Sequence, residues 1–119
     1  ARGYEAQGKV DVFLHEGLID DAIDAIESYG TSHTTIGQVV DVAIKERPEW
    51  AIQACQKQAE WIMNQGKSPY YHAAANWLSK ARQAYQVLGC NEEWQAYLQE
   101  LLNIHGRKYT LVPLLKAIK

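Results

Sequence analysis

Apolar residues recur at intervals of three and four along nearly the whole chain. This spacing places them on one face of an α-helix, which completes a turn about every 3.6 residues. No four-residue window shows the alternation of apolar and polar residues, bounded by turn signals, that indicates a half-buried strand. We therefore predict an all-α fold. The clearest seam lies between residues 71 and 88 and consists of Tyr71, Ala74, Leu78, Ala81, Tyr85 and Leu88.

Glycine and proline divide this pattern into about seven expected helices. Gly17, Gly30, Gly66 and Gly89 each follow an apolar stripe, and glycine accepts the left-handed conformation that ends many helices. Pro48 falls in a first turn, where a missing N–H does no harm. The expected helices run to about residue 15, from 18–20 to 29, from 35 to 46, from 48 to 65, from 69 to 88, from 91 to about 105, and from 111 to 118.

Four polar residues stand where N-caps are expected. An N-cap side chain accepts a hydrogen bond from a backbone N–H of the first turn, which otherwise has no partner. Thr35 has capping-box spacing with a glutamine three residues later. Ser68, Asn91 and Thr110 precede the fifth, sixth and seventh expected helices. We predict that all four residues cap their helices.

The segment HGRKYTLVPLL, residues 105–115, could be a phosphate site or the end of one helix before the next. Arg107 and Lys108 lie where a C-terminal turn presents unpaired carbonyls, which attract cations. Gly106 is placed to reverse the chain. Capping therefore explains most of this cluster without a ligand.

Two arrangements of these helices compete. Loops of two to five residues make neighbouring helices antiparallel. A closed bundle needs one common core, whereas a stack of helix pairs needs only neighbour contacts. We favour the stack, resembling a tetratricopeptide-type superhelix and forming one domain over residues 1–119. Small residues that permit close helix approach support it: Ala22, Ala25, Ala74, Ala81, Ala84 and Ala96.

Composition places the chain among ordinary globular proteins. With 119 residues, 47% of them hydrophobic and 22% charged, it can bury a core. It has no apolar run of about 18 residues and no signal-peptide core, so we predict a cytoplasmic protein. Because it begins at Ala1 without an initiator methionine, we also expect it to be part of a longer protein.

Charge is unevenly distributed, although the formal net charge is only −2. Residues 1–46 carry a net −6 and residues 47–119 a net +4. Weak nucleic-acid binding by the basic part is therefore an alternative function, with Arg82, Arg107 and Lys108 as candidate anion contacts. Affinity for nucleic acid would fall steeply between about 50 and 200 mM salt, because phosphate contacts release counterions.

Motifs for catalysis or metal binding are missing from the sequence. It contains no GxSxG, no glycine-rich phosphate loop, no HExxH and no CxxC. Cys55 and Cys90 are too far apart for a short metal motif, and we expect both to be reduced, with Cys55 in the core and Cys90 at a helix boundary. We predict no enzymatic activity and no cofactor. The four histidines are expected to be partly exposed imidazoles beside helix ends: His15, His33, His72 and His105.

The four tryptophans occur from the fourth expected helix onward. Trp61 and Trp94 align with apolar stripes, and core packing is the expected role of at least three of the four, because an indole buries a large area. Trp77 lies one position away from the seam at Leu78, so it could line a groove. Trp50 is the fourth.

A polar stripe on the fifth expected helix is the best candidate for partner contact. Asn76, Lys80 and Gln83 follow one another at spacings of four and three, which puts them on one helix face next to Trp77. Such a face on a concave surface can bind a peptide, whereas on a convex surface it is only solvated. We predict partner binding by these four residues.

Three stretches carry a family resemblance: WLSKARQAY at residues 77–85, EWQAYLQEL at 93–101 and HGRKYTLVPLL at 105–115. In these the chain resembles the C-terminal helical tail of bacterial, especially cyanobacterial, SWIM-type zinc-finger proteins. The likeness extends upstream through EGLIDDAIDAI at 16–26 and PEWAIQACQKQAEWIM at 48–63, so it covers nearly the whole chain. It implies a tetratricopeptide-like C-terminal tail that acts as a protein-interaction scaffold. The family's zinc site has the pattern CxCx(n)CxH, which these 119 residues lack, so zinc is implied only for another part of a parent protein.

Overall fold

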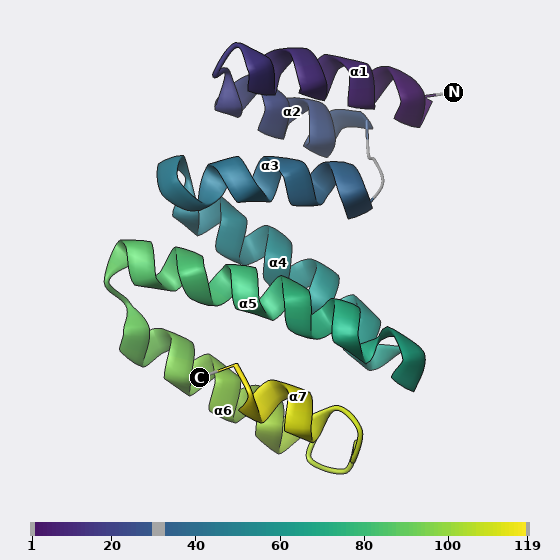
Figure 1. The fold of residues 1–119 in the computed structure, drawn as a ribbon, viewed down its shortest axis with the longest axis vertical. Helices are drawn as coiled ribbons and strands as arrows, with labels where there is room; N and C mark the ends of the chain where they lie inside the picture. Colours follow the sequence, from purple (N-terminus) through teal and green to yellow (C-terminus); the bar gives the residue numbers. More distant parts are fainter. Residues whose placement is uncertain (1, 30–32, 119) are drawn as a thin grey trace.

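The computed structural model describes residues 2–29 and 33–118, with side chains from residue 9 onward except that of residue 29. Within these ranges the chain forms helices and no strand, which confirms the all-α prediction (Figure 1). The helices are α1 (Arg2–His15), α2 (Ile19–Tyr29), α3 (His33–Glu46), α4 (Pro48–Asn64), the short 3-10 helix η1 (Ser68–Tyr70), α5 (Tyr71–Leu88), α6 (Asn91–Ile104) and α7 (Val112–Lys116).

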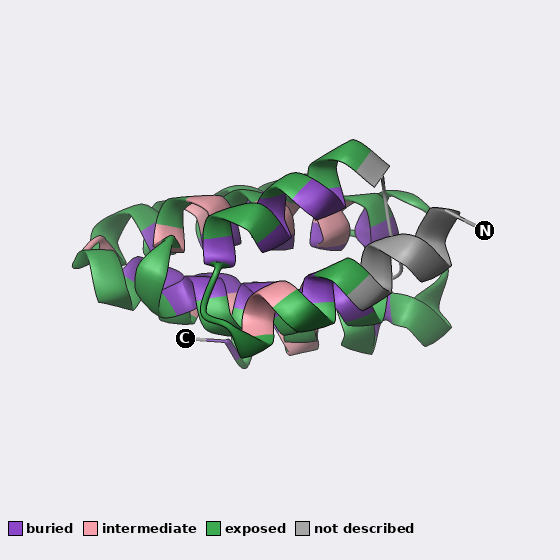
Figure 2. Cartoon of the chain, turned by 90° about the horizontal axis from the view of Figure 1, so that it is seen from above, coloured by how far each residue is buried: buried purple, intermediate pink, exposed green. Residues whose placement is uncertain are grey.

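These helices form a stack of antiparallel pairs. Each α-helix packs against its neighbour in sequence, and α1, α3, α5 and α7 also contact one another in succession. These four form the nearer layer in Figure 1, and Figure 2 shows that buried residues lie on the faces that the two layers turn toward each other. The Cα radius of gyration is 14.9 Å, against about 13.5 Å for a compact domain of this length. The stack is therefore confirmed over the closed bundle.

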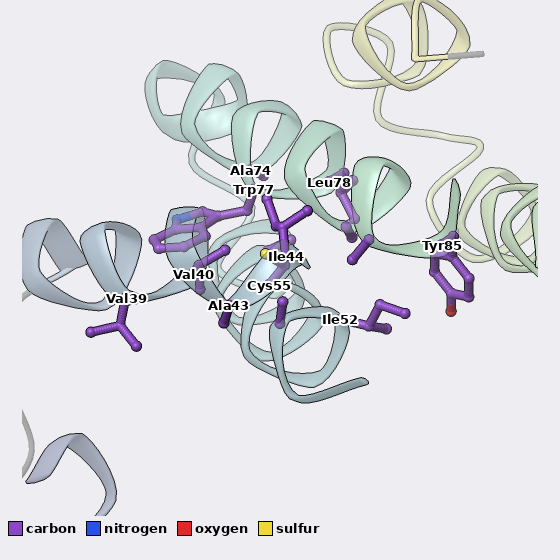
Figure 3. Packing of buried hydrophobic residues seen from close by; sticks show 14 of the residues in the cluster. Val39, Val40, Ala43, Ile44, Ile52, Cys55, Ala74, Trp77, Leu78 and Tyr85 are labelled. Carbon is purple, nitrogen blue, oxygen red and sulfur yellow. The ribbon is translucent and has the colours of Figure 1, made fainter. Parts of the chain in front are cut away.

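The core is one continuous cluster, which includes the region where α5 meets α3 and α4. Figure 3 shows Val40 and Ala43 of α3, Cys55 of α4, and Trp77 and Leu78 of α5 in this region. Four of these five residues are wholly inaccessible to solvent, and Trp77 is 8% exposed. Five of the six alanines expected at helix crossings are buried, which lets backbones approach closely, but Ala96 is exposed on α6.

Most of the expected helix ends are confirmed. Gly17, Gly66 and Gly89 have φ angles of +77°, +69° and +72°, and Pro48 is the first residue of α4. Gly30 lies outside the described residues. The chain turns back after α6 as predicted, but Gly106 does not have a positive φ, so it is not a left-handed cap. Its Cβ would lie 2.9 Å from the Leu102 carbonyl oxygen, so glycine is required for close backbone approach instead.

The predicted N-caps are wrong in detail. Thr35 is buried inside α3, which begins two residues earlier. Ser68 begins η1, and α5 starts only at Tyr71, because the chain after Lys67 first makes a 3-10 turn. Asn91 is already the first residue of α6, and Thr110 lies before the Leu111 N-cap of α7. Helices α4 to α7 have no side-chain cap bond, so their orientation depends on packing of the apolar faces.

An ion pair joins the first pair of helices to the next. Asp20, in the first turn of α2, accepts hydrogen bonds of 2.9 and 2.8 Å from Nε and Nη2 of Arg47, the residue between α3 and α4. This two-point geometry suits a guanidinium and a carboxylate. Both side chains are exposed, so solvent screens the pair and it adds little to stability.

Candidate functional site

The four residues predicted to contact a partner line one hollow between α3 and α5. We call it the α3–α5 groove, and its volume is about 600 Å³. Asn76, Trp77, Lys80 and Gln83 line it from α5, as their helical spacing requires. Five residues of α3 complete the opposite wall, and the sequence had given no reason to place them there. The full lining consists of His33, Thr34, Gly37, Gln38, Asp41, Ala73, Asn76, Trp77, Ser79, Lys80 and Gln83.

Trp77 belongs to both the core and the groove. Its indole is 8% exposed and lies in the cluster of Figure 3, yet it also lines the hollow. Gly37 of α3 lies opposite, and a Cβ built there would be 3.7 Å from Cη2 of Trp77. Because Gly37 has no side chain, space for about one methyl group remains between the ring and the α3 backbone. The rigid indole therefore forms an apolar base beneath the polar walls.

Lys80 spans the groove from α5 to α3. Its Nζ lies 2.8 Å from Oδ1 of Asp41 and 5.7 Å from the centroid of the Trp77 ring. The lysine side chain is 30% exposed, so the ion pair and the cation–π contact are each worth at most about 1 kcal/mol. Together they hold the lysine in place and leave this end of the groove close to electrically neutral.

A second hollow adjoins the groove near the start of α5. We call it the aromatic hollow, and it has a volume of about 380 Å³. His33, Ala73 and Trp77 line both hollows, so the two are adjacent. The aromatic hollow is lined by His33, Trp61, Ile62, Gln65, Lys67, Tyr70, Ala73 and Trp77.

The predicted core position of Trp61 is wrong, because this residue is 58% exposed at the aromatic hollow. The buried face of α4 is centred between Cys55 and Ala59, roughly 140° around the helix from Trp61 at about 100° per residue. The indole instead meets the ring of His33 at a centroid distance of 6.0 Å. Nδ1 of His33 is in turn 2.6 Å from Oε1 of Gln58.

The remaining tryptophans follow the expectation for core packing more closely. Trp94 is wholly buried, with its ring centroid 5.9 Å from that of Tyr85 and 6.3 Å from that of Tyr97. Its Nε1 is buried without a hydrogen-bond partner in the described structure. Trp50 is half-buried and donates a hydrogen bond of 3.0 Å to Oε1 of Glu27.

Three histidines are exposed as expected, but the prediction for His105 is wrong. His15, His33 and His72 are exposed, whereas His105 is only 3% exposed. The chain after α6 turns back and packs α7 against α5 and α6, so the imidazole is covered. Burial, and then the charge of Lys108 with its Nζ 2.8 Å from Nδ1, lower the pKa of His105.

The candidate anion contacts have three different environments. Arg107 is exposed in the turn between α6 and α7. Lys108 is half-buried and directed at His105. Arg82 is half-buried on α5, and its Nε is buried without a hydrogen-bond partner in the described structure. Nucleic-acid binding by these residues stays a prediction.

Both cysteines are free thiols, as expected. Cys55 is wholly buried in the core, and burial raises its pKa to about 12. Cys90 is half-buried at the start of α6. Across residues 2–29 and 33–118, no group of three His, Cys, Asp or Glu side chains is close enough together to hold a metal ion. None of the described helices is long and apolar enough to span a bilayer.

Comparisons with known proteins do not supply a family. No family model, no curated protein and no solved structure matches the chain significantly. The resemblance to SWIM-type zinc-finger proteins therefore stays a prediction.

Proposed function

We propose that the chain is a non-catalytic protein-interaction module that binds a peptide segment of a partner in the α3–α5 groove. One observation carries the proposal: Asn76, Lys80 and Gln83, which form a polar stripe on α5, lie together in a hollow with Trp77 at its base. A groove with a rigid aromatic base and a few directed polar groups is typical of peptide recognition.

The chemistry of the walls suits a polypeptide backbone. The amides of Asn76 and Gln83 can each donate and accept hydrogen bonds, and so can pair with peptide C=O and N–H groups. Asp41 has a carboxylate oxygen available beyond the one that Lys80 contacts, and its side chain is 61% exposed. Trp77 supplies apolar area for a side chain of the ligand. Tryptophan is frequent among the residues that contribute most to binding energy.

The proposal can be tested by selecting peptides from a random phage-displayed library on the wild-type chain. The dissociation constants of the selected peptides are then measured by fluorescence polarisation for wild type and for the variant Asn76→Ala/Lys80→Ala/Gln83→Ala. Each lost hydrogen bond is worth about 0.5–1.5 kcal/mol, so affinity should fall tenfold or more. Nuclear magnetic resonance of the 13.5 kDa chain should show shifted signals at Gly37 and at the Trp77 indole.

A matched control is available on α4. Gln53, Lys57 and Asn64 are exposed and provide the same three residue types away from the α3–α5 groove. Replacing these three by alanine should leave affinity within about twofold of wild type. If the selected peptides bind the groove variant as tightly as wild type, or if no peptide can be selected, the proposal is wrong.

A further inference from the structure

The aromatic hollow beside the groove carries two exposed aromatic side chains. Trp61 at the end of α4 and Tyr70 in η1 are each 58% exposed, and both line this hollow together with Ile62 and Ala73. Exposed apolar patches in soluble proteins frequently mark interaction sites, and Trp and Tyr are the side chains most enriched there. The surface is thus chemically suited to receive a large apolar side chain.

The position of this hollow connects it with the groove. His33, Ala73 and Trp77 line both, so a peptide lying on the Trp77 indole and continuing toward the start of α5 enters the aromatic hollow. In the opposite direction along α5 the same peptide passes Lys80 and the amide of Gln83. The two hollows therefore form consecutive subsites for one extended segment.

Within the described part of the chain, the lining of the aromatic hollow carries a positive charge and no negative charge. Among the described residues that line the aromatic hollow, Lys67 is the one lysine or arginine, and no aspartate or glutamate accompanies it. Lys80 in the neighbouring groove is paired with Asp41. A ligand carboxylate near Lys67 would therefore meet an uncompensated positive charge, whereas a ligand cation would be repelled.

We infer that the aromatic hollow selects a partner segment in which a large apolar residue is adjacent to an acidic residue. Trp61 and Tyr70 contact the apolar side chain, and Lys67 contacts the carboxylate. This inference rests on the proposed function and adds the sequence class of the segment. It also assigns a role to Trp61, which the apolar pattern alone had placed in the core.

Short capped peptides test the subsite without the rest of the groove. The probes are N-acetylated, C-amidated Phe-Glu and Glu-Phe, their lysine counterparts Phe-Lys and Lys-Phe, and Ala-Glu. Binding is followed through the indole N–H signals of Trp61 and Trp77 during titration to millimolar concentration, the range expected for ligands of this size. At least one of the two glutamate probes that contain phenylalanine should bind about fivefold or more tightly than its lysine counterpart. Ala-Glu should bind more weakly than Phe-Glu, because it lacks the large apolar side chain.

Charge reversal provides the decisive variant. Lys67 is exposed, so Lys67→Glu should fold normally and should reverse the preference, so that the lysine probes bind better than the glutamate probes. Trp61→Ala, followed through Trp77, should reduce binding of every phenylalanine probe. The control Lys57→Glu alters an exposed lysine of α4 outside the hollow and should leave the order unchanged.

Two results would overturn the inference: equal binding of glutamate and lysine probes to wild type, or an unchanged order in Lys67→Glu. These outcomes are separable from failure of the proposed function. Peptides from the random library that lose affinity when the stripe on α5 is replaced would still support the groove as a binding site, and would limit the error to the aromatic hollow.

Discussion

Gly37 offers the sharpest test of how stability and binding are related in this stack. It lies inside α3, is buried, and faces the groove. A Cβ at this position would lie 3.6 Å from Nζ of Lys80 and 3.7 Å from the Trp77 ring, which are ordinary van der Waals distances. Glycine inside a helix costs about 0.5–1 kcal/mol relative to alanine. Gly37→Ala should therefore raise the free energy of unfolding by about that amount.

The same methyl group should weaken peptide binding. It would stand on the floor of the α3–α5 groove, next to the indole that the proposed ligand contacts. We expect the affinity of a groove-binding peptide to fall while stability rises. If both effects are found, this opposition would explain why glycine occupies a helical position where alanine would give a more stable helix.

Gly89 provides the matched control because the same substitution there should have the opposite effect on stability. Its φ is +72°, and no atom lies within 4 Å of an added Cβ, so only backbone strain changes. A left-handed alanine costs about 1 kcal/mol or more, so Gly89→Ala should lower stability and leave peptide affinity unchanged.

Urea denaturation followed by circular dichroism at 222 nm measures the change in unfolding free energy for both glycine variants. Thermal denaturation gives a second measure, because each kcal/mol should shift the melting temperature by roughly 4 °C for a chain of this size. The reasoning is refuted if Gly37→Ala destabilises the fold, or if the two variants change stability in the same direction. Unchanged peptide affinity in a stabilised Gly37→Ala chain would instead show that the ligand does not reach the floor of the groove.

Other groups in the fold give further expected results. Cys90 should react with a thiol reagent in the native chain while Cys55 is protected until unfolding, as peptide mapping after brief alkylation would reveal; equal labelling would contradict the packing around Cys55. Burial raises the pKa of Cys55 to about 12, so above about pH 9 the unfolded chain loses a thiol proton that the folded chain keeps. The free energy of unfolding should therefore fall as pH rises, and it should fall less in Cys55→Ala. The lowered pKa of His105 makes the unfolded chain bind more protons below about pH 6.5, so stability should fall on acidification, and a His105→Gln chain with the same pH dependence as wild type would count against this. Tyr97 donates a 2.8 Å hydrogen bond to Oε2 of Glu60, so Tyr97→Phe should cost about 1 kcal/mol in urea denaturation, and no loss would show that the bond is replaced by water.

The sequence correctly predicted the features that are determined within a single helix. Helical periodicity located the helices, and glycines at residues 17, 66 and 89 marked three of their ends, because both signals act within a few residues. The polar stripe on α5 was found for the same reason. Its three members had to share a face once the segment was helical.

Features that depend on how helices pack were not predictable in this way. The Trp61 prediction failed because α4 packs against both α3 and α5 through the face that contains Cys55 and Ala59, and Trp61 lies away from that face. The His105 prediction failed because the turn toward α7 covers the imidazole. In both cases the exposure of the side chain depends on a helix that packs beside it, and helix propensity within the segment does not specify that packing.

The α3–α5 groove combines a feature that the sequence predicts with one that depends on packing. One wall is the stripe on α5, and the other is the face of α3 that contains Gly37 and Asp41, which lies next to α5 because both helices pack on α4. The width of the groove therefore depends on the buried contacts of α4, around Cys55 and Ala59, as well as on the residues that line it. Substitutions that enlarge these side chains should change peptide affinity without touching the ligand, because they would alter the separation of α3 and α5.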